Sequence, residues 1–264
     1  MDQKYPLTGP IPADGPRVVP AATIIIFRKG AQSGKPEFLL VQRAKEMRFA
    51  GGAVVFPGGR VDPSDRVIAT QLAPDGDQEI TSSKIAGIRE TLEETGLLIG
   101  IEQSVNASQA AEARAMILET EDLAPVLKHF DWSIDLSALV FYAHWCPPFD
   151  KAFDTRFFVT DLGTGSVDIT VDATENTKLF WATAEQALEM NTAGEITLIF
   201  PTLRNVERLD GFENFNDACK SAEEFPPRRM SAGRETIDGE DWITIPDGRG
   251  YPVLAQRWEV ARRG

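Results

Sequence analysis

Runs of apolar residues separated by short turns predict the strands of a mixed sheet. Residues 18–28 include Ala-Ala-Thr-Ile-Ile-Ile-Phe, a β-branched run typical of a buried strand. A turn containing Gly30 and Gly34 follows, and residues 37–43 are expected to pair with the first strand as a hairpin. Further strands are predicted at residues 136–145, 153–160 and 179–182.

Segments rich in alanine, glutamate and leucine predict helices beside these strands. We expect helices at residues 104–118, 122–129, 183–190, 197–209 and 212–223. From residue 225 the composition shifts to proline, arginine and glycine, and residues 242–245 and 251–254 suggest a closing hairpin or an extended tail. The pattern predicts an α+β fold in one elaborated domain, residues 1–264, with an N-terminal arm (1–15) and a C-terminal extension (225–264).

One predicted helix, residues 84–97, has two different faces. At about 100° per residue, three carboxylates share one stripe and three apolar side chains share the opposite stripe. The acidic stripe is Glu90, Glu93 and Glu94, and the apolar stripe is Ile85, Ile88 and Leu92. Ser82 or Ser83 is expected to cap the start of this helix, and Gly96 is expected to end it.

The acidic stripe indicates chemistry as well as structure. Like charges at this range repel and raise each other's pKa, and a divalent cation removes that penalty. Carboxylate oxygens are hard ligands that suit Mg²⁺ or Mn²⁺. Arg89 lies one turn before Glu93 and can pair with it. The alternative is an ordinary amphipathic helix with a solvated acidic face, which is common.

The turn Phe56-Pro57-Gly58-Gly59 and this helix together resemble the Nudix box, G-x5-E-x7-R-E-U-x-E-E-x-G-U, in which U is a bulky apolar residue. Gly59 matches the opening glycine, and the second half is matched by Arg89, Glu90, Glu93, Glu94, Gly96 and Leu97. The resemblance implies an α/β/α sandwich with a mixed sheet and additional helices. It also implies hydrolysis of a diphosphate linkage. The implied ligands of Mg²⁺ or Mn²⁺ are Glu90, Glu93 and Glu94, with Arg89 beside them and the Gly58 carbonyl as a further candidate.

The chain departs from this pattern at three points. Asp65 replaces the first glutamate, six residues after Gly59. Then 23 residues separate Asp65 from Arg89, where the family pattern has seven. Thr91 replaces the usual apolar residue. The inserted segment is rich in proline, aspartate and glycine in its middle, so we expect a loop that leaves the acidic helix intact.

The segment before the turn resembles a second signature, LLTxRSxxxRxxxGxVxFPGG, found in coenzyme A diphosphatases. The matching residues include Leu39, Leu40, Arg43, Arg48, Gly52 and Val54, whereas Val41 and Ala44 replace the expected threonine and serine. The implied role of Arg43 and Arg48 is phosphate binding, which forked guanidinium groups perform well. The alternative is that both pair with local acids such as Glu46.

Other candidates for the site come from outside the two signatures. Arg60 and Arg156 are further candidates for substrate binding, with a salt bridge to Asp154 or Asp161 as the equal alternative for Arg156. The family often takes another acid, sometimes the general base, from a separate loop. Glu175 is our first candidate for that acid and Asp172 the second, and a solvated loop acid is an equal alternative for either.

Composition limits the classes of partner. The net charge is −13 and the sequence pI about 4.7, which argues against non-specific binding of nucleic acid or anionic membranes. Local arginines and a cation still permit an anionic nucleotide substrate. No secretory signal or run of about 18 apolar residues is visible, so we expect a cytoplasmic protein without a membrane span. Cys146 and Cys219 are expected to be free thiols, and a homodimer remains open.

Three functions follow from these observations. The first is hydrolysis of coenzyme A or an acyl-CoA to 3′,5′-ADP and a 4′-phosphopantetheine derivative. The second keeps the reaction but changes the substrate to ADP-ribose or another nucleoside diphosphate derivative. The third, from a different class, is a Nudix fold that binds a nucleotide as a sensor without hydrolysing it. The intact Glu90, Glu93 and Glu94 cluster weighs against the third.

Overall fold

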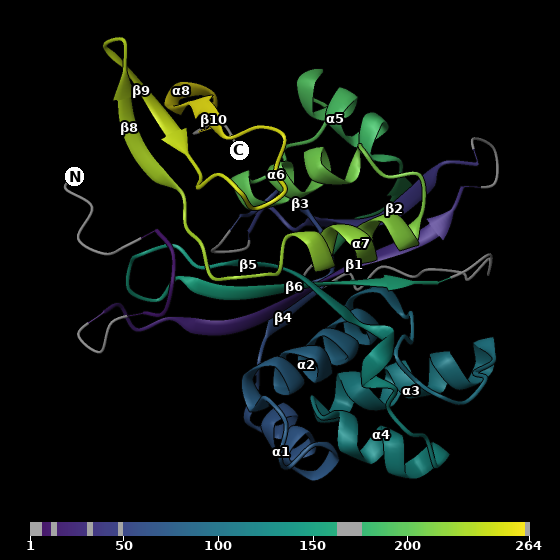
Figure 1. The fold of residues 1–264 in the computed structure, drawn as a ribbon. Helices are drawn as coiled ribbons and strands as arrows, with labels where there is room; N and C mark the ends of the chain where they lie inside the picture. Colours follow the sequence, from purple (N-terminus) through teal and green to yellow (C-terminus); the bar gives the residue numbers. More distant parts are fainter. Residues whose placement is uncertain (1–6, 12–14, 31–33, 47–49, 163–175, 262–264) are drawn as a thin grey trace.

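Two layers of helices enclose a mixed β-sheet (Figure 1). The computed structural model describes residues 7–11, 15–30, 34–46, 50–162 and 176–261. Within them the main sheet has seven strands, in the order β3-β2-β1-β6-β5, with β4 beside β1 and β7 beside β2. This arrangement confirms the predicted α+β class and the α/β/α sandwich.

The strands agree closely with the apolar runs of the sequence. Their bounds are β1 Val19–Lys29, β2 Pro36–Arg43, β3 Val54–Val55, β4 Gly58–Arg60, β5 Val140–Trp145, β6 Phe153–Asp161 and β7 Asn176–Ala182. β1 and β2 pair antiparallel, with Phe27 opposite Phe38, which confirms the predicted hairpin. β1 pairs parallel with β6, so the sheet is mixed.

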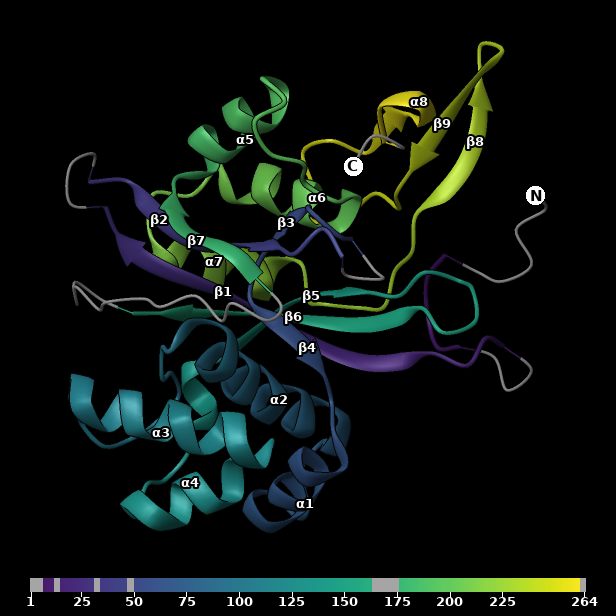
Figure 2. The same cartoon turned by 180° about the vertical axis from the view of Figure 1, so that it is seen from behind.

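The helices divide between the two faces of the sheet. The lower layer holds α1 (Pro63–Leu72), α2 (Gln78–Thr95), α3 (Ala107–Thr120) and α4 (Leu123–Phe130). The upper layer holds α5 (Ala184–Thr192), α6 (Phe200–Leu209) and α7 (Phe215–Glu224). The reverse view in Figure 2 shows the same division. The helices predicted at residues 104–129 and 183–223 are α3 to α7, and residues 136–138, predicted as strand, form a 3₁₀ turn before β5.

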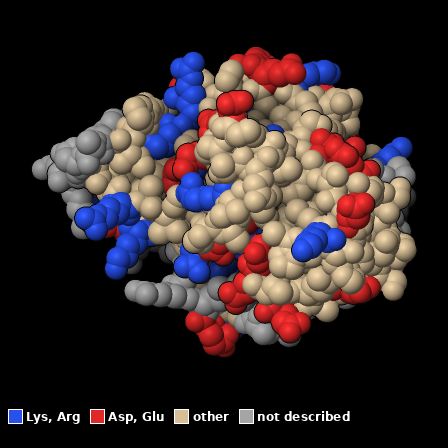
Figure 3. Space-filling model, turned by 90° about the horizontal axis from the view of Figure 1, so that it is seen from below, with Lys and Arg blue, Asp and Glu red and all other residues tan. Residues whose placement is uncertain are grey.

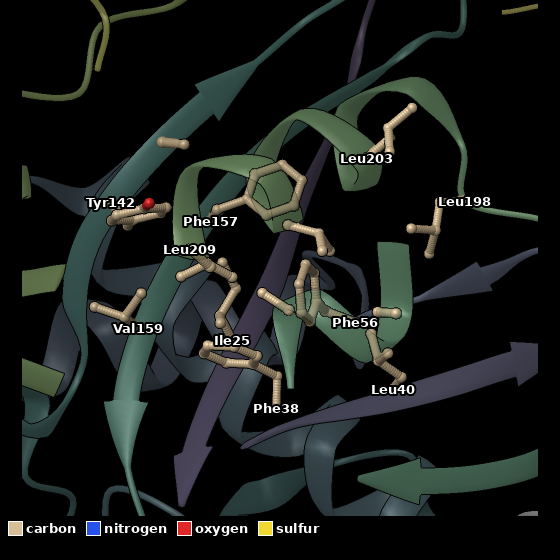
Figure 4. Packing of buried hydrophobic residues seen from close by; sticks show 14 of the residues in the cluster. Ile25, Phe38, Leu40, Phe56, Tyr142, Phe157, Val159, Leu198, Leu203 and Leu209 are labelled. Atoms are coloured by element: carbon tan, nitrogen blue, oxygen red, sulfur yellow. The ribbon is translucent and has the colours of Figure 1, made fainter. Parts of the chain in front are cut away.

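β1 separates two hydrophobic clusters because alternate side chains of a strand point to opposite faces. Ile25 and Phe27 pack into the upper cluster, whereas Ile24 and Ile26 pack into the lower one. Figure 4 shows the upper cluster, in which Ile25 and Phe38 of the sheet lie near Leu209 of α6. Burial on both faces explains why β1 is a nearly continuous apolar run rather than an alternating one.

The inserted segment is helical rather than a loop. α1 occupies residues 63–72, and only residues 73–77 form a turn before α2. Pro63 is the first residue of α1, a position where its fixed φ favours a helix and no backbone N–H is needed. The prediction of a loop was therefore correct only for residues 73–77 and wrong for the residues on both sides of them.

α2 begins six residues earlier than predicted. Its cap is Asp77, whose Oδ1 accepts hydrogen bonds from the backbone N–H groups of Glu79 and Ile80, both at 3.0 Å. Ser82 and Ser83 are buried inside the helix, where both hydroxyls donate to the carbonyl of a residue one turn earlier. The predicted serine caps were wrong because an earlier aspartate caps the helix.

The C-terminal extension forms a small separate sheet above the first. It contains β8 (Gly233–Ile237), β9 (Glu240–Thr244) and β10 (Ala255–Arg257), followed by α8 (Trp258–Ala261). Figure 1 shows the β8–β9 hairpin projecting from the body. β9 also pairs antiparallel with β10, and the Ile245 backbone N–H donates to the Leu254 carbonyl at 2.9 Å. The closing hairpin predicted from residues 242–245 and 251–254 is therefore present, and β8 adds a further strand to it. Part of the N-terminal arm is paired, because Thr8 bridges to Met230.

Two expectations from composition can be compared with the structure. Cys146 and Cys219 are free, and Cys146 is buried, as expected. None of the helices in the described residues is both long and apolar enough to cross a membrane.

Candidate functional site

α2 carries the acidic residues on the face predicted from its period. Ile85, Ile88 and Leu92 are fully buried in the lower cluster, which fixes the rotation of the helix. Gly96 ends the helix as predicted, with a φ of 75° that favours glycine. The glutamates of the opposite stripe are therefore directed toward β4 and the start of α1.

Asp65 takes the place of the first glutamate of the pattern. Its Oδ1 and Oδ2 accept hydrogen bonds from Nε and Nη2 of Arg89, at 3.1 and 3.0 Å. Asp65 is fully buried at the start of α1, and Arg89 is only 2% exposed. A two-pronged ion pair of this kind is geometrically specific. The 23 residues between Asp65 and Arg89 thus leave the contact between the two halves of the box intact.

Arg89 also holds the carboxylates of its own helix. Its Nη1 lies 3.1 Å from Oε1 of Glu90 and 3.3 Å from Glu93, and its Nη2 donates to the Arg60 carbonyl at 2.9 Å. Burial alone would lower the pKa of Arg89, but Asp65, Glu90 and Glu93 raise it on balance. Arg89 is therefore a charged centre that orients two of the three predicted metal ligands.

The glycine turn closes the site from the other side. The backbone N–H of Gly58 donates to Glu94 Oε2 at 3.0 Å. Gly59 leaves space for Glu90, because a Cβ at position 59 would lie 2.2 Å from Glu90 Oε1. The turn and the acidic stripe are thus in direct contact, as their joint resemblance to one motif implies.

Two residues of the site were not found in the sequence. Asn176, at the start of β7, donates through Nδ2 to Glu94 Oε1 at 3.2 Å. Arg114 of α3 donates to the Glu93 carbonyl from Nε at 3.1 Å and Nη2 at 2.9 Å, at the C-terminal end of α2. A positively charged side chain is stabilised at the C-terminal end of a helix, because the helix dipole is negative there. No feature of the local sequence identifies Asn176 as a site residue. For Arg114, the only feature is that an arginine stands among the alanines of α3.

The predicted arginines divide into two places. Arg43 lies opposite Asn176 in the β2–β7 pairing, next to the acidic stripe. Arg60 ends β4 with an exposed side chain. Arg156 is buried beside Asp154, with Nη1 3.4 Å from that carboxylate, and lies 3.6 Å from Glu79 near the start of α2. Glu79 and Glu90 are about 16 Å apart along the helix at 1.5 Å per residue. Arg156 is therefore in the salt bridge that was its alternative, away from the acidic stripe.

Three sequence candidates, Arg48, Asp172 and Glu175, lie outside the described residues. Their roles remain predictions.

Comparisons with known proteins agree with this geometry. No protein-family model matches the chain. Acyl-coenzyme A diphosphatase NUDT19 of Gallus gallus is 25% identical over 79% of this chain and 68% of that protein. The Homo sapiens protein of the same name is 25% identical over 78% of this chain and 67% of its own length. The crystal structure of a NUDIX hydrolase from Alicyclobacillus acidocaldarius has a TM-score of 0.64 and 26% identity, over 78% of this chain and 96% of that one.

The chain is a Nudix hydrolase. Its box is divided by an insertion that is mostly helical. The general reaction of the family, hydrolysis of a diphosphate linkage, fits the acidic helix and the glycine turn described above.

Nudix hydrolases generally use divalent cations, and the donors of this chain fit them chemically. Burial raises the pKa of Glu90 to about 8, with Arg89 opposing and the charges of Glu94 and Glu93 adding to the increase. Burial also raises the pKa of Glu93 against the effect of Arg89. A divalent cation would relieve this crowding of hard carboxylate donors.

The described side chains are nevertheless not arranged around one point. No group of three or more acidic, histidine or cysteine residues among them could hold a metal ion as it stands. Glu90 and Glu93 contact Arg89, and Glu94 accepts from Gly58 and Asn176. Each of the three carboxylates is therefore held by other groups of the protein, and the described side chains alone do not enclose a cation position.

Charge is unevenly distributed over the lower face of the Nudix hydrolase. Figure 3 shows more lysine and arginine side chains on one side of this face than on the other, whereas acidic side chains are spread over much of it, including its upper and lower edges. The net charge of −13 is therefore not spread uniformly, which is compatible with an anionic nucleotide substrate.

Proposed function

We propose that this Nudix hydrolase cleaves the diphosphate of coenzyme A or an acyl-CoA in a reaction that needs Mg²⁺ or Mn²⁺. Water adds to one phosphorus atom, the bridging P–O bond breaks, and the proton of the water is released. The products are 3′,5′-ADP and 4′-phosphopantetheine or its acyl derivative. Two relatives bear the name acyl-coenzyme A diphosphatase, which supports this substrate class.

The observation that carries the proposal is the position of Arg43. This arginine belongs to the signature that resembles coenzyme A diphosphatases, and it pairs across β2 and β7 with Asn176, which contacts Glu94. Its backbone N–H donates to the Ala53 carbonyl at 2.9 Å, which ties it to the segment before the glycine turn. Its Nε is buried and has no hydrogen-bond partner among the residues that the structure describes, so it is a candidate donor to an anion. Arg43 would bind a phosphate oxygen of the diphosphate.

The remaining roles follow from the contacts of each residue. Glu90, Glu93 and Glu94 would hold the cation, with the Gly58 carbonyl as a further donor. When bound, the cation offsets phosphate charge and lowers the pKa of water in the site. Arg89 holds Glu90 and Glu93 in place while Asp65 fixes Arg89. Arg48 and Arg60 are proposed to contact the substrate, and Glu175 is proposed as the base, with Asp172 as the alternative. Arg156 would reach only a part of the substrate remote from the diphosphate.

The test is hydrolysis of a panel with Mg²⁺ and with Mn²⁺, with the products resolved by chromatography. The panel contains coenzyme A, acetyl-CoA, ADP-ribose, NADH and a diadenosine polyphosphate. We expect 3′,5′-ADP to be released from coenzyme A or acetyl-CoA. It should come from these compounds themselves and not from a contaminant that is present in all five samples. Cleavage of ADP-ribose alone would overturn the proposed substrate. Tight binding of a panel member without turnover would instead indicate a nucleotide sensor.

Variants of the acidic stripe test the site. Glu93→Gln and Glu94→Gln are expected to abolish metal-dependent turnover, because each removes a charged oxygen donor. Glu119→Gln is the matched control, since Glu119 is exposed on α3 and the charge change is the same. Turnover that is unchanged in both stripe variants would reject the site assignment.

A further inference from the structure

A second group of cationic side chains gathers on the face of the sheet opposite α2. A small cavity of about 10 Å³ lies between β5, the end of α6 and the C-terminal extension, and it has room for about one water molecule. Arg208, Arg228 and Arg249 line it, and no aspartate or glutamate of the described residues does. The cavity is therefore lined by positive charge in a chain whose net charge is −13.

Arg208 is the buried cation of this cavity. It is only 4% exposed, its Nη1 donates to the Tyr142 carbonyl at 3.3 Å, and its Nη2 donates to the Ser221 hydroxyl at 2.8 Å. These oxygens are neutral, and within the described part of the chain no carboxylate forms a salt bridge with Arg208. Its Cζ lies 4.0 Å from the centre of the Tyr142 ring, which offsets part of the cost of burial. A buried charge without a counter-ion is costly, so this position favours an anion.

The hydroxyl of Tyr142 is an independent sign of a ligand. Tyr142 also lines the cavity and is fully buried in the upper cluster (Figure 4), and its hydroxyl has no hydrogen-bond partner among the described residues. A buried polar group without a partner calls for an explanation. Tyr251 lines the same cavity, but its hydroxyl already accepts from Trp145 and donates to Asn205. An unused phenol donor and an uncompensated guanidinium charge thus line one space.

The C-terminal extension packs tightly against the guanidinium. Gly250 has a φ of 77°, and a Cβ there would lie 3.0 Å from Arg208 Nε and 2.9 Å from Phe225 Cδ2. Arg249, the preceding residue, is half-buried, whereas Arg228 is exposed. Neither arginine forms an ion pair with a carboxylate in the ranges that the structure describes. Arg228 and Arg249 thus leave two charged donors at the side of the cavity that faces solvent.

We propose that this cavity binds the terminal phosphate group of a small anion, either inorganic phosphate or a phosphate monoester. One phosphate oxygen occupies the narrow space, where it accepts from the Tyr142 hydroxyl beside the charge of Arg208. The remaining oxygens face Arg228 and Arg249 at the solvent side, because guanidinium groups suit phosphate oxygens. The inference is independent of the proposed function, since α2 and its acidic stripe lie on the other face of the sheet.

The test is titration calorimetry with inorganic phosphate and, separately, with 3′,5′-ADP, at constant ionic strength in a buffer without phosphate. Arg249→Gln and Tyr142→Phe should each raise the Kd of the anion that binds by roughly fivefold or more, because each removes a donor to a charged oxygen. Arg257→Gln is the matched control, since Arg257 is an exposed arginine of the same extension that does not line the cavity. Its Kd should stay within about twofold of the wild type. Arg208 is left unchanged, because it joins β5 to α7 through Ser221.

A parallel variant tests whether the anion binds at the diphosphate site instead. Weaker binding in Arg43→Gln, with a wild-type Kd in Arg249→Gln and Tyr142→Phe, would place the anion there and overturn the proposal. Absence of binding of both anions to the wild type would also overturn it. Binding that depends on Arg249 and Tyr142 supports the proposal, and the anion that binds identifies the source of the phosphate group. The Tm of each variant without anion should not fall below that of the wild type by more than a few degrees, so that weaker binding is not a loss of fold.

Discussion

Two adjacent glycines in the turn before α1 are required for different reasons. A Cβ on Gly58 would lie 2.2 Å from the Ala22 carbonyl oxygen and 2.7 Å from Thr23 Cα, and its φ is 151°. The three atoms nearest to a Cβ on Gly59 would all belong to the end of the Glu90 side chain in the site, the first at 2.2 Å. Backbone atoms of a paired strand cannot move away cheaply, whereas a glutamate can rotate. Gly58 therefore serves the fold, and Gly59 serves the position of Glu90.

The two alanine variants should separate these roles. Gly59→Ala is expected to keep its Tm near the wild-type value while turnover falls by up to about a hundredfold, because a displaced ligand group lowers rate steeply. Gly58→Ala is expected to lose more than about 3 kcal/mol of stability through backbone strain and clash. Circular dichroism melts and panel turnover measure both effects. Wild-type turnover in Gly59→Ala would show that Glu90 need not occupy its present position.

At this scale, the sequence predicts contacts within one helix and misses contacts between elements that are far apart in the chain. Glu90, Glu93 and Glu94 could be placed together because one helical period determines their relation. Asn176 is 82 residues from Glu94, and their contact depends on how β7 pairs with β2, where the register shifts at Arg43. A pairing register with such an irregularity has no signature in the local sequence.

Among the elements, α2 approaches β1 closely because it has a glycine on its buried face. A Cβ on Gly87 would lie 2.4 Å from Cδ1 and 2.9 Å from Cγ1 of Ile24, a fully buried residue of β1. Alanine would favour the helix intrinsically by about 1 kcal/mol. Overpacking a tight core costs about 1–3 kcal/mol. The close contact is expected to outweigh the helix propensity.

Gly87→Ala should therefore lower the free energy of unfolding by up to about 2 kcal/mol, the difference between these two effects. Ile24→Val removes the Cδ1 atom that the new methyl group would meet. The double variant Gly87→Ala with Ile24→Val is expected to be more stable than the sum of the two single changes predicts. Urea unfolding of all four proteins completes the cycle. Simple additivity would show that Ile24 does not set the helix-to-sheet distance.

Most elements could be predicted from the sequence because their apolar patterns are continuous. The prediction was wrong where turn-forming residues lie next to residues that start a helix. Residues 73–77 suggested a loop for the whole insertion. Pro63, at the first position of α1, and Asp65, in its first turn, are both typical of a helix start. The start of α2 was missed similarly, since Asp77 is a better-placed cap than the serines that follow it.

For the whole molecule, the C-terminal extension is joined to the main core through Tyr251. The phenol accepts from Trp145 Nε1 of β5 at 2.9 Å and donates to Asn205 Oδ1 of α6 at 3.1 Å. Tyr142, in the same hydrophobic cluster, is also fully buried, but within the described part of the chain its hydroxyl has no hydrogen-bond partner. The two tyrosines therefore form a natural pair for comparison.

Tyr251→Phe is expected to cost about 1–3 kcal/mol, because it leaves buried polar groups of Trp145 and Asn205 unpaired. Tyr142→Phe should be neutral or stabilising, since it removes a buried hydroxyl that is not satisfied. Calorimetry should show one unfolding transition for both variants and the wild type, as the prediction of a single domain requires. Two resolved transitions would contradict that prediction, and equal losses in both variants would contradict the hydrogen-bond argument.

The ion pair between Asp65 and Arg89 has a consequence for how such chains are recognised. It closes a path of 23 intervening residues, which leaves along α1 and returns along α2. Closing a flexible loop costs only about 0.6 kcal/mol more for each doubling of its length. A Nudix box is therefore better described as a set of meeting points in space than as a string of fixed length. A search of genomes for these spatial contacts would find family members that a search for a motif of fixed spacing misses.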